Sequence, residues 1–161
     1  MRIAGIDPGL NATGYGIVDV DGDQCRHVAH GVVRTRSADS LARRLVLIRD
    51  GLRTVFAQWS PEVGAVEASF VGSNARSALA LGHARAAAIL ALADSALEVH
   101  EYAPTMIKTA VGSHGRGSKD EVAKMVTMQL GLADRLSSSD AADALAVAIT
   151  HWAHTRLEGR I

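Results

Sequence analysis

The stretch Arg2–Gly9, with the sequence RIAGIDPG, decides the fold. Ile3, Ala4 and Ile6 are apolar and bracketed by small residues, as expected for a short strand that is buried on both faces. A proline–glycine pair ends the strand directly after Asp7. A carboxylate at the C-terminal end of such a strand opens onto a ligand crevice, although an isolated Asp7 could also simply cap its own turn.

Length and composition restrict the class of protein. The chain has 161 residues, so we expect a single domain over residues 1–161. It carries 17 basic and 17 acidic residues, and any basic surface for nucleic acid must therefore come from local clustering. The single Cys25 excludes an intrachain disulfide. The most apolar stretch, 86–93, is short for a membrane span, and we expect a soluble, cytoplasmic protein with no membrane partner.

The segment after Asp7 predicts a β-rich start. Asp21 and Gly22 stand between two β-rich runs, which indicates a hairpin and three strands in all. We expect the glycine-rich segment Leu10–Gly16 to form a loop close to Asp7. Its glycines would allow the backbone to approach a phosphate, or would serve only the conformation of the turn.

Two long helices are predicted from apolar spacing. In Ser37–Trp59 the apolar residues recur every three or four positions, and the outer face is expected to carry solvated basic side chains: Arg43, Arg44, Arg49 and Arg53. The segment Ser73–Ser95 is an alanine-rich helix. Its smooth apolar face comprises Ala75, Ala78, Leu79, Gly82, Ala86, Ile89, Leu90 and Ala93. Contact of this face with the chain's own sheet is favoured over contact with a second copy of the chain.

A second short apolar run, Val63–Val66, also stops on a carboxylate, Glu67. Two neighbouring strands that each end on an acid would place the two carboxylates a few ångströms apart at one edge of a sheet. A cation between them would hold both ionised. Oxygen-only ligands favour magnesium or manganese.

Asp140 and Asp143 stand three residues apart in the first turn of the last predicted helix, so they share one helix face. Acids there also suit the helix dipole, which is the simpler explanation. The small residues around them favour tight packing of this turn onto the sheet: Ala141, Ala142, Ala144 and Ala146. We therefore expect the pair to point towards Asp7 and Glu67.

The segment 104–119 contains basic residues and no acid, and it includes Lys108, Arg116 and Lys119. Lysines beside the carboxylates could hold a phosphate and offset charge in a transition state, or they could be ordinary surface lysines. Phe70 follows Glu67 by three residues. It could stack on an exposed base at the mouth of the site, or it could be buried in the core.

Together these segments resemble the RuvC family of Holliday-junction resolvases, over nearly the full length of the chain. The similar motifs are Gly5–Gly9 with Thr13–Gly16, Val66–Glu67 with Phe70, Asn74–Leu79 and Asp140–Thr150. The resemblance implies an α/β, RNase H-like fold, in which helices flank both faces of a five-stranded mixed sheet. It also implies a homodimer that works with the RuvA and RuvB branch-migration proteins.

The activity implied by this resemblance is a structure-selective endonuclease of DNA recombination and repair. Paired nicks in a four-way DNA junction would leave 5′-phosphate and 3′-hydroxyl ends. Asp7, Glu67, Asp140 and Asp143 would hold two Mg²⁺ ions, or Mn²⁺, with Asp7 bridging both. Lys108 and Lys119 would assist catalysis. The DNA-binding residues in this interpretation are Phe70, Asn74, Arg76, Lys108, Arg116 and Lys119.

Two other classes compete with this interpretation. A strand that ends in Asp7 before a Gly-x-x-x-x-Gly segment also resembles the first phosphate loop of actin-like and sugar-kinase ATPases. Those enzymes need a second lobe, for which this chain is too short, and ATP turnover without DNA would favour them. A non-catalytic junction-binding scaffold would lack one or more of the four acids, and all four are present.

Overall fold

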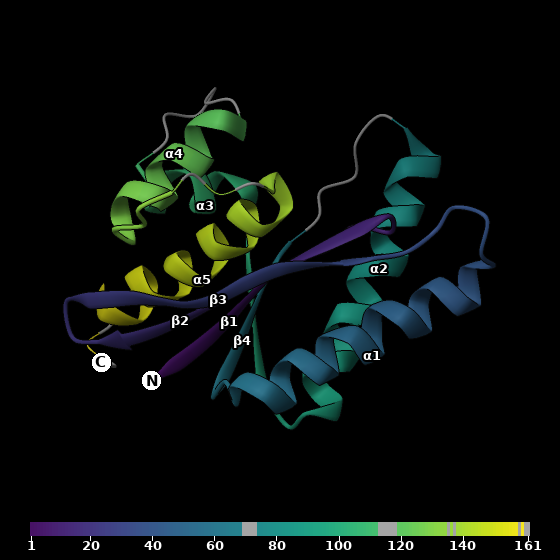
Figure 1. The fold of residues 1–161 in the computed structure, drawn as a ribbon, viewed down its shortest axis with the longest axis horizontal. Coiled ribbons are helices and arrows are strands. Elements are labelled where there is room, and N and C mark those ends of the chain that lie inside the picture. Colours follow the sequence, from purple (N-terminus) through teal and green to yellow (C-terminus); the bar gives the residue numbers. More distant parts are fainter. Residues whose placement is uncertain (69–73, 113–118, 135, 137, 158, 160–161) are drawn as a thin grey trace.

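One mixed β-sheet forms the centre of the molecule (Figure 1). The computed structural model describes residues 1–68, 74–112, 119–134, 136, 138–157 and 159. The strands are β1 (Arg2–Asp7), β2 (Ala12–Asp21), β3 (Gln24–Arg34), β4 (Val63–Glu67) and β5 (Glu98–Tyr102). They lie in the order β3-β2-β1-β4-β5, so the stretch that opens the chain becomes the central strand.

The sheet has an antiparallel half and a parallel half. β1, β2 and β3 are joined antiparallel, and the predicted hairpin turn at Asp21 and Gly22 is confirmed, with Gly22 at a φ of 51°. β1 pairs parallel with β4, and β4 pairs parallel with β5. The parallel half aligns the C-terminal ends of its three strands at one end of the sheet.

Helices cover both faces of this sheet (Figure 1). They are α1 (Leu41–Trp59), α2 (Ala75–Asp94), α3 (Pro104–Ala110), α4 (Lys119–Gln129) and α5 (Ser139–Leu157). α1 and α2 cover one face with one apolar cluster, and α5, flanked by α3 and α4, covers the other face with a second. α1 begins four residues after the predicted Ser37, because the side chain of Ser40 caps it by accepting from the Arg43 N–H at 3.4 Å.

α5 packs directly against the backbone of β1 and β2. A Cβ atom added at Gly5 would lie 2.1 Å from the carbonyl oxygen of Ala144, and one added at Gly14 would lie 1.9 Å from that of Asp140. Gly14 and Gly16 lie within β2, so the prediction that they belong to a phosphate-approaching loop is wrong. Their missing side chains make room for the small-residue helix α5, whose predicted tight packing on the sheet is confirmed.

α2 buries a different face from the one predicted to contact the sheet. Its buried residues are Ala84, Ala87, Ala88, Ala91 and Leu92. Most of the predicted apolar face is instead exposed, with Leu79 at 63% and Leu90 at 55% exposure, so the preference for the sheet as its contact is wrong. Among the described helices, α2 alone is long and apolar enough to cross a membrane; this is weak evidence, because core helices of folded domains pass the same test.

Candidate active site

Two carboxylates meet where β1 and β4 end. The parallel register pairs Ile6 with Val66, so the next residues of these neighbouring strands, Asp7 and Glu67, stand side by side at the same end of the sheet. Both are half-buried. We call this end of the sheet the carboxylate end.

A third carboxylate and one ammonium group join them from the helices. A cavity of about 260 Å³ is lined by Asp7, Glu67, Pro104, Ile107, Lys108, Val122 and Asp143. Asp143 comes from the second turn of α5, and Lys108 comes from α3. Buried apolar side chains form part of the wall, since Ile107 and Val122 are each 6% exposed. The fold thus gathers three acids and one base from four separate elements.

Asp140 occupies a different position from Asp143. It begins the first turn of α5, is half-buried, and is not among the residues that line this cavity. Its carbonyl oxygen lies against Gly14 of β2, which is the register partner of Asp7 and is separated from the strand of Glu67 by β1. Participation of Asp140 in the site therefore stays a prediction.

The remaining predicted residues are spread around this site. Asn74 is exposed and caps α2 by accepting from the Ser77 N–H at 3.1 Å, and Arg76 is exposed in the first turn of that helix. Lys119 is the first residue of α4. Its side chain, and the whole of Phe70 and Arg116, lie outside the described residues.

The donor set of the cavity fits a divalent cation in its chemistry. Asp7, Glu67 and Asp143 offer oxygen ligands only, which hard cations such as Mg²⁺ prefer. Within the part of the chain that the structure describes, no three His, Cys, Asp or Glu side chains already stand close enough together to hold a metal ion.

A buried arginine fixes the turn that follows Asp7. Arg44 is 9% exposed, so its predicted place among the solvated side chains of α1 is wrong. Its guanidinium donates to the Thr35 hydroxyl at 2.9 Å, to the Leu10 carbonyl at 3.0 Å and to the Asn11 side-chain oxygen. The helix period alone missed this residue, because α1 begins beside the turn and its first-turn side chains reach across to it.

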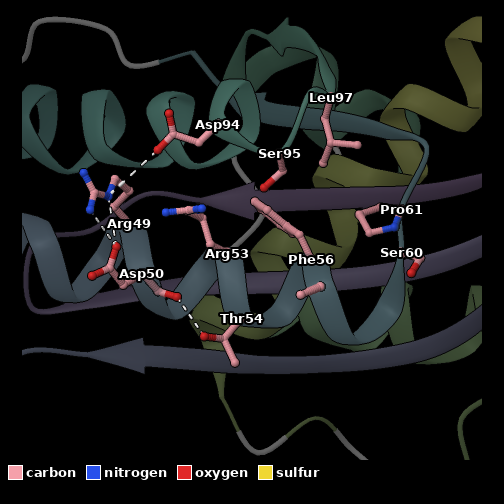
Figure 2. Close-up of a pocket in the computed structure, with 11 residues that line it drawn as sticks. Arg49, Asp50, Arg53, Thr54, Phe56, Ser60, Pro61, Asp94, Ser95 and Leu97 are labelled. Atoms are coloured by element: carbon pink, nitrogen blue, oxygen red, sulfur yellow. Dashed lines mark hydrogen bonds and ion pairs between the residues drawn. The ribbon is translucent and has the colours of Figure 1, made fainter.

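A larger cavity lies at the opposite end of the sheet (Figure 2). It measures about 700 Å³ and lies between the C-terminal halves of α1 and α2. Figure 2 shows Arg49 facing two acids, with its guanidinium 2.9 Å from Asp50 and 4.0 Å from Asp94. Its acids are thus engaged with an arginine, whereas three acids share the smaller cavity at the carboxylate end.

Known proteins resemble this chain in both sequence and fold. The family model of crossover junction endodeoxyribonuclease RuvC matches residues 3–151. The protein of that name from Bordetella parapertussis is 49% identical over 151 residues, which cover 94% of this chain and 82% of the relative. The one from Paramagnetospirillum magneticum is 48% identical over 155 residues, covering 96% and 92%.

A solved structure agrees with these relatives. Thermus thermophilus RuvC, in complex with a Holliday junction substrate, superimposes with a TM-score of 0.87 at 34% identity, covering 99% of this chain and 98% of its own. The predicted RNase H-like fold and the predicted enzyme class are thereby confirmed. The chain belongs to the crossover junction endodeoxyribonuclease RuvC family.

Proposed function

We propose that this chain resolves four-way DNA junctions by divalent-metal-dependent hydrolysis at the carboxylate end of its sheet. The observation that carries the proposal is the convergence of Asp7, Glu67, Asp143 and Lys108 on one cavity in a chain of the RuvC family. The products are nicked duplexes with 5′-phosphate and 3′-hydroxyl ends. The protein acts in the cytoplasm.

The chain's own side chains divide the work at this cavity. Asp7, Glu67 and Asp143, with Asp140 from the preceding turn of α5, hold Mg²⁺, and Mn²⁺ can replace it. Divalent cations bound there supply Lewis acidity and lower the pKa of water. The Lys108 ammonium lies in the same wall and offsets the negative charge that develops on the scissile phosphate. Lys119, Phe70 and Arg116 contact the DNA, as do Asn74 and Arg76.

A gel assay tests this function directly. The protein is incubated with a synthetic four-way junction, or with a linear duplex that contains one arm of it, in the presence of Mg²⁺ or of EDTA. We expect paired nicks in the junction only, with Mg²⁺ only, and products that a ligase can seal. Binding of the junction without cutting in either Mg²⁺ or Mn²⁺ would contradict the proposal, and so would ATP turnover without DNA.

We further propose that two copies of the chain pair through the exposed face of α2 and cooperate with RuvA and RuvB. Small residues and two leucines form this face, and all of its members are exposed: Leu79, Gly82, Ala86, Leu90 and Ala93. Apart from its own helix backbone, no atom of the described residues lies within 4 Å of a Cβ added at Gly82, so a second helix can approach closely. Pairing there gives two sites for two strands of one junction.

Leu90→Glu tests this pairing. Burial of a carboxylate in the apolar contact should shift the protein from dimer to monomer in sedimentation velocity, while thermal unfolding of the monomer stays near wild type because Leu90 is 55% exposed. Met128→Glu on α4 is the matched control, since Met128 is an apolar side chain of 66% exposure on another surface. A Leu90→Glu protein that remains dimeric would place the dimer contact elsewhere.

A further inference from the structure

A buried hydrogen bond joins β5 to the C-terminal half of α5. The hydroxyl of Tyr102 lies 2.8 Å from Nδ1 of His151, and the two residues are only 3% and 2% exposed. The ring of His100 lies against that of His151, with centroids 4.5 Å apart, and the ring of His154 meets the edge of Tyr102 at 5.7 Å. We call the hydrogen-bonded pair of Tyr102 and His151 the clasp.

The β5 side of the clasp leads directly to two groups of the carboxylate cavity. Tyr102 is the register partner of Glu67, and the N–H of Ala68 donates to the Tyr102 carbonyl at 2.8 Å. α3 begins two residues after Tyr102 and carries Lys108. The position of Tyr102 therefore determines where Glu67 ends its strand and where Lys108 enters the cavity.

The α5 side of the clasp leads to the third group. His151 and Asp143 belong to the same uninterrupted helix and are eight residues apart, about 12 Å along its axis. A helix of this length moves as a unit, so a shift of His151 along the sheet carries Asp143 with it. The clasp therefore joins α5, which carries Asp143, to β5. β5 pairs with the strand that ends at Glu67, and it leads into α3, which carries Lys108.

We propose that the clasp of Tyr102 and His151 sets the spacing between Glu67 and Asp143, and so tunes the affinity of the carboxylate cavity for its divalent cation. Both residues are positioning residues, because neither lines the cavity. This proposal rests on the proposed function, in which those carboxylates hold the cation.

The chemistry of the clasp explains why it can serve this purpose. Apolar contacts along α5 are non-directional, whereas a buried hydrogen bond is satisfied in one arrangement of its two partners. Breaking it removes one polar contact of a buried side chain, and the helix relaxes. Carboxylate ligands are sensitive to such relaxation, since groups that orient metal ligands typically change metal affinity by about 10–100-fold.

Direct metal binding gives a test that does not depend on cutting. The dissociation constant of Mn²⁺ is measured from the free-ion electron paramagnetic resonance signal for the wild type and for Tyr102→Phe, His151→Leu and His151→Gln. We expect Tyr102→Phe and His151→Leu each to weaken Mn²⁺ binding about tenfold. His151→Gln keeps a side-chain amide that can hydrogen-bond the Tyr102 hydroxyl, and it should restore binding to within about threefold of wild type. The double variant Tyr102→Phe/His151→Leu should bind no more weakly than either single variant.

Trp152→Phe is the matched control. It removes another hydrogen bond of α5, from the indole Nε1 to the Gly22 carbonyl at 3.0 Å, at the opposite end of the sheet. We expect it to lower the unfolding temperature without weakening Mn²⁺ binding. The proposal is overturned if Tyr102→Phe binds Mn²⁺ like wild type, or if Trp152→Phe weakens binding equally.

Two further results separate the clasp from the proposed function. Wild-type protein that binds Mn²⁺ but leaves four-way junctions uncut would refute the proposed function while leaving the difference between clasp variants measurable. If Tyr102→Phe does not fold, His151→Gln and His151→Leu, compared with each other, decide the matter, because equal Mn²⁺ affinities in these two would refute the clasp.

Discussion

The two ends of the sheet use carboxylates in opposite ways. At the end opposite the cavity, Asp19 is held by Arg2 through two contacts, Nε to Oδ1 at 2.7 Å and Nη2 to Oδ2 at 2.8 Å, and Arg2 also donates to the Trp59 carbonyl. At the carboxylate end, Asp7, Glu67 and Asp143 share one cavity. The comparison contrasts an acid that a bidentate arginine holds in place with acids that are gathered at one cavity, where we propose that they hold a cation.

The two ends of the sheet also differ in which atoms pack against their glycines. At the carboxylate end, Gly14 admits the backbone of α5, and the nearest atom to an added Cβ is a main-chain oxygen at 1.9 Å. Towards the opposite end, the atoms nearest to a Cβ on Gly64 are the δ-methyl groups of Leu92, at 2.5 and 2.8 Å. Main-chain atoms cannot rotate away, whereas a leucine tip can. The first turn of α5 is therefore held more strictly against the sheet than the part of α2 that faces Gly64.

The largest expected effect follows from replacing an aspartate by asparagine at each end of the sheet. Asp7→Asn keeps the shape but removes a charge that the cations would share, so single-turnover cutting of a junction should fall on the order of a thousandfold, about 4 kcal/mol, while junction binding is retained. Asp19→Asn and Asp21→Asn should cut at nearly the wild-type rate. Cutting by Asp7→Asn within tenfold of wild type would refute the assignment of the carboxylate end.

Glycine substitutions probe the second difference. Gly14→Ala should lower the free energy of unfolding by about 2–3 kcal/mol, since the first turn of α5 must move away from β2, and cutting should fall with it. Gly64→Ala should cost less than about 1 kcal/mol, because only the tip of Leu92 has to turn. Urea unfolding of both variants measures this contrast, and equal losses would show that α5 is no more strictly placed than α2.

Sequence patterns predicted most of this architecture because local chemistry dictated it. Short apolar runs that stop at Asp7 and Glu67 could only be buried strands, and both acids lie where those runs end. The roles of Gly14, Arg44 and the exposed face of α2 could not be predicted from local pattern. Each depends on which distant segment packs nearby: α5 against Gly14, the turn at Leu10 and Asn11 against Arg44, and α1 against one face of α2.

The clasp and the composition of the carboxylate cavity also could not be predicted from local sequence pattern. The spacing of Asp140 and Asp143 predicted a shared helix face, yet Asp143 alone of the two lines the cavity, beside residues of α3 and α4, while the Asp140 carbonyl lies against Gly14 of β2. No sequence signal links Tyr102 to His151, which are 49 positions apart. Such pairs become visible only once the helix is placed on the sheet.

A pH titration sharpens the contrast between the two uses of acids. The hydrogen bond from Arg2 holds the pKa of Asp19 below its ordinary value, so this acid stabilises the fold above its unfolded pKa and the contribution is lost as pH falls through the lower, folded pKa. Both side chains are a third or more exposed, and solvent screening limits the contribution to about 0.5–1 kcal/mol. The unfolding free energy of wild type should exceed that of Asp19→Asn at pH 7, and the difference should shrink as the pH falls below about 4, the ordinary pKa of an aspartate. A constant difference across this range would contradict the account.

The smallest expected effect concerns the backbone at the end of the sheet opposite the carboxylate end, where one substitution should raise the free energy of unfolding. Ala96 has a φ of 56° in the turn that ends α2, where the Leu97 N–H donates to the Leu92 carbonyl at 3.1 Å and the Ala96 N–H donates to the Ala93 carbonyl at 2.9 Å. This is a helix C-terminus in which glycine is preferred, because a Cβ is strained in the left-handed region. Ala96→Gly should raise the free energy of unfolding by about 0.5–1 kcal/mol and leave junction cutting unchanged, since the turn lies far from Asp7. Gly22→Ala is the converse control, with a φ of 51° and open space around it, so it should cost a similar amount through backbone strain alone. A loss of stability in Ala96→Gly would contradict the account of backbone strain at this turn. Altered cutting would show that the opposite end of the sheet affects the active site.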